Sequence, residues 1–125
     1  MSNIWKDGML GLIVGDALGV PVEFMSRMEL MKNPVTGMRE YGTHHQPRGT
    51  WSDDSSMALA ELDSIRTVGT IDYTDMMERF SRWCMYGEYT PFGEVFDIGT
   101  ATSRALMNYA KGIAPPWHQV LYAHI

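Results

Sequence analysis

Apolar residues recur at three- and four-residue spacing along most of the chain, and strict alternation of apolar and polar residues is rare. The clearest example is a stripe made of Tyr73, Met76, Met77, Phe80, Trp83 and Cys84. This spacing places the side chains on one face of a helix and is typical of a helix that packs against a core. The sequence therefore predicts an all-α fold, in which Cys84 is a small buried apolar residue.

Residues that start and stop helices divide this pattern into separate segments. We expect a first helix from about Asn3 to about Gly19, before Pro21, and a second from Ser52 to Gly69. Further helices are expected after Asp72 or Thr74, near Thr100 and after Pro116. Ala58, Leu62 and Ile65 are predicted to share one face of the second helix, and the positions predicted to point inward from the helix near Thr100 are Ala101, Ala105, Leu106 and Tyr109. The expected architecture is an orthogonal multi-helix bundle.

The segment from about residue 23 to residue 51 interrupts the helical pattern with Pro34, Gly37, Gly42, Pro47 and Gly49. Apart from a short helical turn near residues 28–31, it is predicted to be an irregular loop. Loops of this length are often functional.

Length and charge restrict the class of protein. With 125 residues, the chain fits one domain, residues 1–125. Its net charge of −5 offers no basic surface for nucleic acid or an anionic membrane. The single cysteine gives no sign of a disulfide framework, and no apolar segment is free enough of charged residues to suit a signal peptide or a membrane span. We therefore expect a cytoplasmic location.

Gly11, Gly15 and Gly19 lie at four-residue intervals on one face of the first helix, although each glycine costs about 1 kcal/mol relative to alanine in a helix. The spacing predicts a close approach to this backbone. The stretch lacks the Lys-Ser/Thr pair of a phosphate-binding loop and the preceding strand of a dinucleotide site, so helix packing is its simpler explanation.

The stretch "GTWSDDSSMALAEL", residues 49–62, contains the adjacent carboxylates Asp53 and Asp54. Both can stabilise a helix start through its free N–H groups and dipole. Ser52 can already supply the cap, however, and neighbouring carboxylates repel each other unless a cation or donors neutralise them. The alternative role is therefore binding of a hard cation such as Mg²⁺ or Ca²⁺, with the Ser52 hydroxyl as a further ligand.

Three other polar positions also have two interpretations. Glu23 is either an exposed loop residue or a carboxylate that needs a metal or a proton in an apolar setting. Asp97 either caps a helix or points into a cleft. His44, His45 and Arg48 lack the spacing of a zinc pair, so they are predicted to lie in a solvated loop.

Three stretches in this order resemble the ADP-ribosylglycohydrolase family, which includes dinitrogenase reductase-activating glycohydrolases: "GDALGVPVEF", "GTWSDDSSMAL" and "FDIGTATSRAL". The resemblance extends from about Gly8 to about Ala110. It implies an all-α fold with two Mg²⁺ ions in a cleft that binds ADP-ribose. The implied reaction is hydrolysis of the glycosidic bond that joins ADP-ribose to a modified protein side chain, often arginine, or a related ADP-ribosyl link.

The resemblance also implies roles for individual residues. Ser52, Asp53 and Asp54 would supply metal-binding oxygens, with the two aspartates counted as catalytic. Glu23 would lie beside the metals and assist proton transfer. Asp97 and Gly99 would face the substrate, where free N–H groups at the following helix start suit an anion. Ser55 stands where the family more often has threonine.

Family members are substantially longer and complete the metal site with an Asp-x-Asp-Thr motif, which is absent from this sequence. The sequence is therefore expected to correspond to a truncated N-terminal half of the domain, with a separate C-terminal half as its expected complement. Half a ligand set should bind Mg²⁺ weakly. The alternative function is a non-catalytic remnant that binds a partner or itself through exposed apolar surface.

Overall fold

A computed structural model of the chain describes residues 3–113, and the predicted helix after Pro116 lies outside these residues. The elements in chain order are α1 (Ile4–Gly19), η1 (Val20–Val22), α2 (Arg27–Lys32), η2 (Gly42–His44), α3 (Asp53–Val68), α4 (Tyr73–Tyr86) and α5 (Thr100–Ala110). The described part contains no strand, only an isolated bridge between Tyr41 and Gln46. The predicted all-α class is confirmed. None of these helices is long and apolar enough to cross a membrane.

Side-chain caps explain where the longer helices begin. Asn3 accepts hydrogen bonds from two backbone N–H groups at the start of α1, and Asp72 does the same for α4. Ser52 caps α3 by accepting from the Asp54 N–H. Each cap satisfies N–H groups that have no partner inside the helix, which stabilises the helix by about 1 kcal/mol. The predicted starts of these helices are therefore confirmed.

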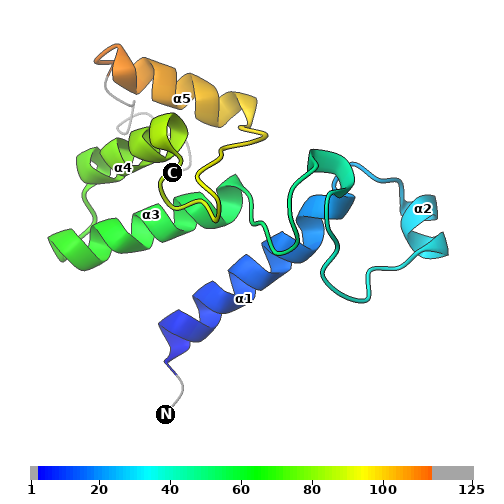
Figure 1. The fold of residues 1–125 in the computed structure, drawn as a ribbon. Coiled ribbons are helices and arrows are strands. Elements are labelled where there is room, and N and C mark those ends of the chain that lie inside the picture. Colours follow the sequence, from blue (N-terminus) through cyan, green and yellow to red (C-terminus); the bar gives the residue numbers. More distant parts are fainter. Residues whose placement is uncertain (1–2, 114–125) are drawn as a thin grey trace, which may run out of the picture.

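Figure 1 shows α3, α4 and α5 gathered at one side of the molecule. Helix α3 packs against α4, and α4 packs in turn against α5. Helix α1 contacts α3 and leads into η1, which packs against η2. The short α2 projects from the far end of the molecule (Figure 1). The segment from residue 23 to residue 51 is irregular apart from α2, which confirms the helical turn predicted near residues 28–31, and η2, which packs against η1.

The core lies between α4, α5 and the loop that joins them. Its centre is formed by Met77, Trp83 and Leu106, and Trp83 is almost completely buried. Partly buried side chains pack around this centre: Met57, Phe80, Cys84, Tyr89, Val95, Ile98 and Tyr109. Most of the predicted stripe on α4 is thus confirmed. Tyr73 lies outside it, since its side chain is exposed.

Helix α3 buries a face other than the one that carries Ala58, Leu62 and Ile65. Its fully buried residues are small: Ser55, Ser56, Ala60 and Ser64. The predicted Ala58, Leu62 and Ile65 instead line a groove shared with Ile4 and Trp5 of α1, and Ile65 is exposed. The prediction that these three residues share one face is therefore confirmed, and the small buried residues lie on the rest of the helix. In α5, Leu106 is buried as expected, whereas Ala101 and Ala105 are exposed.

The glycine face of α1 is open. A Cβ atom built on Gly11, Gly15 or Gly19 would meet no atom of the described residues within 4 Å. The predicted close approach to this backbone is therefore not made by residues 3–113. Several large apolar side chains of the same helix are also exposed, among them Trp5, Leu10 and Val14.

A buried ion-pair network joins α3, α4 and the loop after α4. Arg79 is buried and its Nε donates to Asp75 at 2.6 Å, while one terminal nitrogen donates to Asp63 and, at 3.0 Å, to the Tyr89 hydroxyl. The Tyr89 hydroxyl donates to Asp63 at 2.9 Å. Hydrogen bonds from Arg66 and Tyr89 lower the pKa of Asp63, and the bond from Arg79 lowers that of Asp75. Folding is thus coupled to the ionisation of both carboxyl groups.

We expect acid to weaken the fold through this network. A carboxyl group whose folded pKa is lowered stabilises the protein above its unfolded pKa of about 3.9, and this stabilisation is lost as pH falls through the folded pKa. Asp63→Asn should lower the urea midpoint at about pH 7, and the difference from wild type should shrink towards about pH 3. The difference between wild type and Asp63→Asn separates the contribution of the Asp63 carboxylate from that of other groups that titrate in the same pH range. A constant difference across the range would contradict the coupling.

Candidate functional site

The start of α3 is held by a carboxylate from α1. One oxygen of Asp16 accepts from the Ser52 hydroxyl at 2.8 Å. The other accepts from the Ser52 N–H at 2.9 Å, the Ser55 N–H at 3.2 Å and the Ser55 hydroxyl at 2.5 Å. Ser52 and Ser55 are buried, so these four bonds link α1 to α3 in a setting where water does not compete. The position of the neighbouring Asp53 and Asp54 therefore depends on Asp16.

Asp53 and Asp54 occupy the first turn of α3, where the helix dipole favours negative charge. Asp54 is exposed and Asp53 is half-buried. Burial raises the pKa of Asp53, with the charge of Asp54 as the second cause. The helix start therefore does not fully compensate the Asp53 carboxylate. A bound cation would stabilise the ionised form of this carboxylate, as expected if Asp53 is a metal ligand.

Ser52 has several partners already. Its hydroxyl donates to Asp16 and accepts from the Asp54 N–H at 3.3 Å. A hydroxyl oxygen has two acceptor lone pairs, so one remains for a metal. Ser52 is thus mainly a structural cap, and as a ligand it would be the third member of the set with Asp53 and Asp54.

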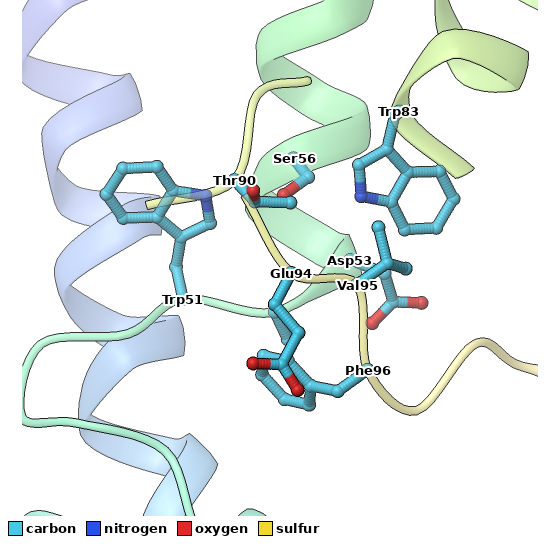
Figure 2. Close-up of a pocket in the computed structure, with 9 residues that line it drawn as sticks. Trp51, Asp53, Ser56, Trp83, Thr90, Glu94, Val95 and Phe96 are labelled. Carbon is cyan, nitrogen blue, oxygen red and sulfur yellow. The ribbon is translucent and has the colours of Figure 1, made fainter. Parts of the chain in front are cut away.

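Asp53 lines a narrow crevice between α3, α4 and the loop before α5 (Figure 2). The indoles of Trp51 and Trp83 lie on opposite sides of it, and Val95 and Phe96 also line it. The crevice has no interior room for a water molecule. A ligand that uses Asp53 must therefore approach its outer end.

The loop between α4 and α5 is attached to α3 through the Tyr89 carbonyl. This oxygen accepts from Trp51 Nε1 and from the Ser56 hydroxyl, each at 3.0 Å. Tyr89 has a positive φ of 62°, a conformation that is uncommon for a residue with a side chain. These bonds hold the loop that carries Phe96 and Asp97.

Glu23, His44 and Asp97 form a second polar group. His44 Nε2 lies 2.5 Å from a Glu23 oxygen and 3.7 Å from an Asp97 oxygen. The three come from the end of η1, from η2 and from the loop before α5. Within residues 3–113 this is the one group of three or more histidine, cysteine or acidic side chains with the compactness of a metal site. The Asp53–Asp54 pair does not have a third such ligand there.

The prediction of a solvated loop at residues 44–48 is wrong for His44. Its side chain is 11% exposed, because the ring packs against Phe24 and Phe96. His45 and Arg48 are exposed as expected. Gly99 is the N-cap residue of α5, and no side chain caps that helix start.

The structure thus places Asp97 with Glu23, and places Asp53 and Asp54 at the start of α3. Phe96 connects the two groups, since it lines the Asp53 crevice and its ring lies 5.2 Å from that of His44. Sequence reasoning missed Asp16 and His44. A lone carboxylate on an apolar helix needs a partner, and this was the available signal for Asp16. Nothing local marked His44, whose partners lie 21 and 53 positions away in the sequence.

Comparison with known proteins supports the resemblance. Residues 5–123 match the ADP-ribosylglycohydrolase family. The chain is 39% identical to ADP-ribosylarginine hydrolase Tri1 of Serratia proteamaculans over 106 residues, which is 85% of this chain and 28% of that protein. The protein of the same name from Pseudomonas putida is 37% identical over the same shares.

A third relative is ADP-ribosyl-dinitrogen reductase glycohydrolase of Rhodospirillum rubrum, which is 33% identical over 80% of this chain and 32% of its own length. The aligned part therefore spans about a third of each of these curated relatives.

Removing the Asp16 carboxylate should destabilise the fold. Asp16→Ala leaves two buried hydroxyls and two N–H groups without their acceptor, and a single lost partner of this kind costs about 1–3 kcal/mol. We expect a loss of at least about 3 kcal/mol in the free energy of unfolding, measured by urea denaturation. Asp16→Asn should lose less, because it keeps one acceptor.

Asp7→Ala is the matched control on α1, since Asp7 is exposed in the first turn. Equal unfolding free energies for Asp16→Ala and Asp7→Ala would contradict the anchoring role of Asp16.

Proposed function

The chain belongs to the ADP-ribosylglycohydrolase family, and from this premise we propose that it supplies acidic residues for hydrolysis of an ADP-ribosyl glycosidic bond. Two relatives are named as ADP-ribosylarginine hydrolases and a third as an ADP-ribosyl-dinitrogen reductase glycohydrolase. We therefore propose an ADP-ribosylated protein side chain, arginine in particular, as the substrate. The observation that carries the proposal is the Asp53–Asp54 pair, positioned at a helix start by the Asp16 anchor.

Mg²⁺ is the proposed cofactor, held by Asp53, Asp54 and the Ser52 hydroxyl. Carboxylate and hydroxyl oxygens are its preferred ligands. The raised pKa of Asp53 and the exposure of Asp54 fit this role, because within residues 3–113 no cationic side chain forms a salt bridge with either carboxylate. Asp16 does not fit it, since its oxygens already accept four hydrogen bonds.

Three oxygen donors do not fill the near-octahedral shell of Mg²⁺. We propose that further ligands come from polypeptide equivalent to the part of the relatives that this chain does not span. The open glycine face of α1 is a place where such polypeptide can pack, because glycine leaves the helix backbone accessible.

Hydrolysis requires that a water oxygen bond to the anomeric carbon while the bond from that carbon to the side-chain nitrogen breaks. The water loses a proton, and the departing nitrogen gains one. Bound Mg²⁺ would orient the ribose hydroxyls and stabilise negative charge on oxygen. Glu23 is the proposed proton acceptor, since it is partly exposed and lies beside His44, which also contacts Asp97 in the loop before α5. Asp97 and the free N–H groups after Gly99 would bind the substrate.

The Asp pair should be essential to this reaction. The chain is mixed with a polypeptide comprising the part of the Serratia relative outside the aligned 106 residues, and release of ADP-ribose from an ADP-ribosyl-arginine peptide is followed by chromatography with and without Mg²⁺. Asp53→Asn or Asp54→Asn should reduce the rate at least about 100-fold, as expected when a group that stabilises developing charge is lost.

Glu61→Gln is the control, because Glu61 is an exposed acid on the same helix. Failure of the complemented wild-type chain to release ADP-ribose would contradict the proposal, and so would full activity of the Asp53 variant.

The second candidate function is a non-catalytic module that binds itself. The observation that favours it is the exposed apolar surface of α1, where Leu10 and Val14 are about half exposed, at 50% and 48%, beside the open glycine face. Exposed patches of this kind promote association.

If the chain associates with itself through α1, sedimentation velocity should show a dimer whose population rises with protein concentration. Val14→Lys should restore the monomer, since a buried lysine would be costly in the interface. Met28→Lys, at an exposed position on α2, should not. A monomer at every concentration would rule out self-association.

A further inference from the structure

Phe24 is an aromatic residue that the fold leaves open to solvent beside the proposed site. Its side chain is 82% exposed, and its backbone has a positive φ of 62°. We propose that the Phe24 ring binds the positively charged guanidinium group of the modified arginine, and so selects an arginine-linked substrate. The role rests on the proposed hydrolysis of an ADP-ribosyl-arginine bond, for which Phe24 is a specificity-determining residue.

The turn that carries Phe24 favours a residue without a large side chain. The Met25 N–H donates to the Val22 carbonyl at 3.2 Å, which closes a β-turn over residues 22–25. Glu23 has φ −53° and ψ 143°, and Phe24 has the positive φ, so the turn is of type II. Glycine or asparagine is preferred at the position of Phe24 in such a turn. Phenylalanine is strained there, and its exposed ring buries little apolar area to offset the strain.

The ring is nevertheless held in place. The Thr43 hydroxyl donates to the Glu23 carbonyl at 2.7 Å, which fixes the backbone next to Phe24. The Phe24 ring packs against the His44 ring at an interplanar angle of 69°, with 5.9 Å between the ring centres. The His44 side chain is only 11% exposed, so it is a firmly packed neighbour. A ring that is exposed and already positioned loses little entropy when a ligand stacks on it.

Negative charge beside the ring indicates which ligand it suits. His44 Nε2 lies 2.5 Å from a Glu23 oxygen and 3.7 Å from an Asp97 oxygen. Two ionised carboxylates and one imidazole keep a net negative charge whether the imidazole is neutral or protonated. Asp97 is 48% exposed, so its carboxylate can accept hydrogen bonds from a ligand. A guanidinium group fits such surroundings, because it donates to carboxylates and stacks on aromatic faces.

The chemistry of the proposed substrate matches this surface. A guanidinium group keeps its positive charge when one of its nitrogens carries a substituent. The carbon that joins it to ADP-ribose must lie near Glu23, the proposed proton acceptor, and Glu23 directly precedes Phe24. The alternative is that the ring is covered by polypeptide equivalent to the part of the relatives that this chain does not span. The two alternatives differ in whether Phe24 responds to arginine.

The test is a titration of N-acetyl-arginine methylamide into the full chain, followed by nuclear magnetic resonance of ring-labelled phenylalanine. We expect the Phe24 ring signal to shift with this probe. It should stay unchanged with the citrulline counterpart, which has nearly the same shape without the charge. Stacking of a cation on an aromatic ring contributes roughly 2- to 30-fold in affinity. Phe24→Asn should therefore weaken binding of the arginine probe at least about 3-fold, measured from the shift of the Asp97 N–H signal.

The variants separate loss of the ring from loss of the fold. Asparagine tolerates a positive φ, so Phe24→Asn should keep the helix content seen by circular dichroism. Phe24→Tyr keeps an aromatic ring and should keep the affinity for the arginine probe. Phe92→Asn is the matched control, because Phe92 is also an exposed aromatic residue and is not part of this group.

A second measurement uses the complemented hydrolysis assay. Phe24→Asn should raise KM for the ADP-ribosyl-arginine peptide by the same factor and leave kcat within about 2-fold, since the ring binds the ground state and the transition state alike. If the complemented wild-type chain releases no ADP-ribose, the proposed hydrolase function fails, and the arginine titration still decides the role of Phe24.

Four results would each overturn that role. They are absence of arginine binding by the wild-type chain, equal binding of the citrulline probe, unchanged affinity in Phe24→Asn, and a Phe24→Asn variant that associates more weakly with the complementing polypeptide while it binds the arginine probe normally.

Discussion

The arrangement of the site depends on one carboxylate, that of Asp16, which joins α1 to the first turn of α3. The start of a helix presents several N–H groups that have no partner inside the helix. Here the Asp16 carboxylate of another helix accepts from the Ser52 and Ser55 N–H groups. It also accepts from the hydroxyls of the same two serines. The same interaction therefore stabilises the packing of α1 and sets the orientation of Asp53 and Asp54. A substitution at Asp16 should therefore change both the stability of the fold and the position of the two aspartates.

Tyr89 makes a comparable connection on the other side of α3. Its hydroxyl joins the Arg79–Asp63 network, and its carbonyl accepts from Trp51 and Ser56. The loop that leaves Tyr89 carries Phe96 and Asp97 to the second polar group. Removal of one partner from a buried ion pair leaves an uncompensated charge and is strongly destabilising. Changes in the Arg79 network should therefore also disturb this loop. The stability of α3 and α4 thus supports both acidic groups.

The two acidic groups differ in what they can bind. The pair on α3 offers only oxygen atoms, and one of its members is incompletely compensated. The other group has an imidazole between two carboxylates and a partly apolar enclosure. In the part of the chain that the structure describes, the oxygen pair lacks further acidic ligands, and α1 presents an uncovered glycine face. Both features agree with a chain that spans about a third of its curated relatives.

The helices could be predicted from the sequence because their causes are local. A spacing of three and four residues, the caps Asn3, Ser52 and Asp72, and the stop at Gly69 act within a few positions of one another. The family could be predicted as well, because its motifs are contiguous. The role of Asp16, the burial of His44 and the small-residue face of α3 could not, because each depends on contacts between distant segments. Sequence alone thus determined which residues form helices and which carry acidic chemistry. Only tertiary packing decided which carboxylates share a site, since hydrogen bonds and burial between α1, α3 and the loop before α5 bring them together.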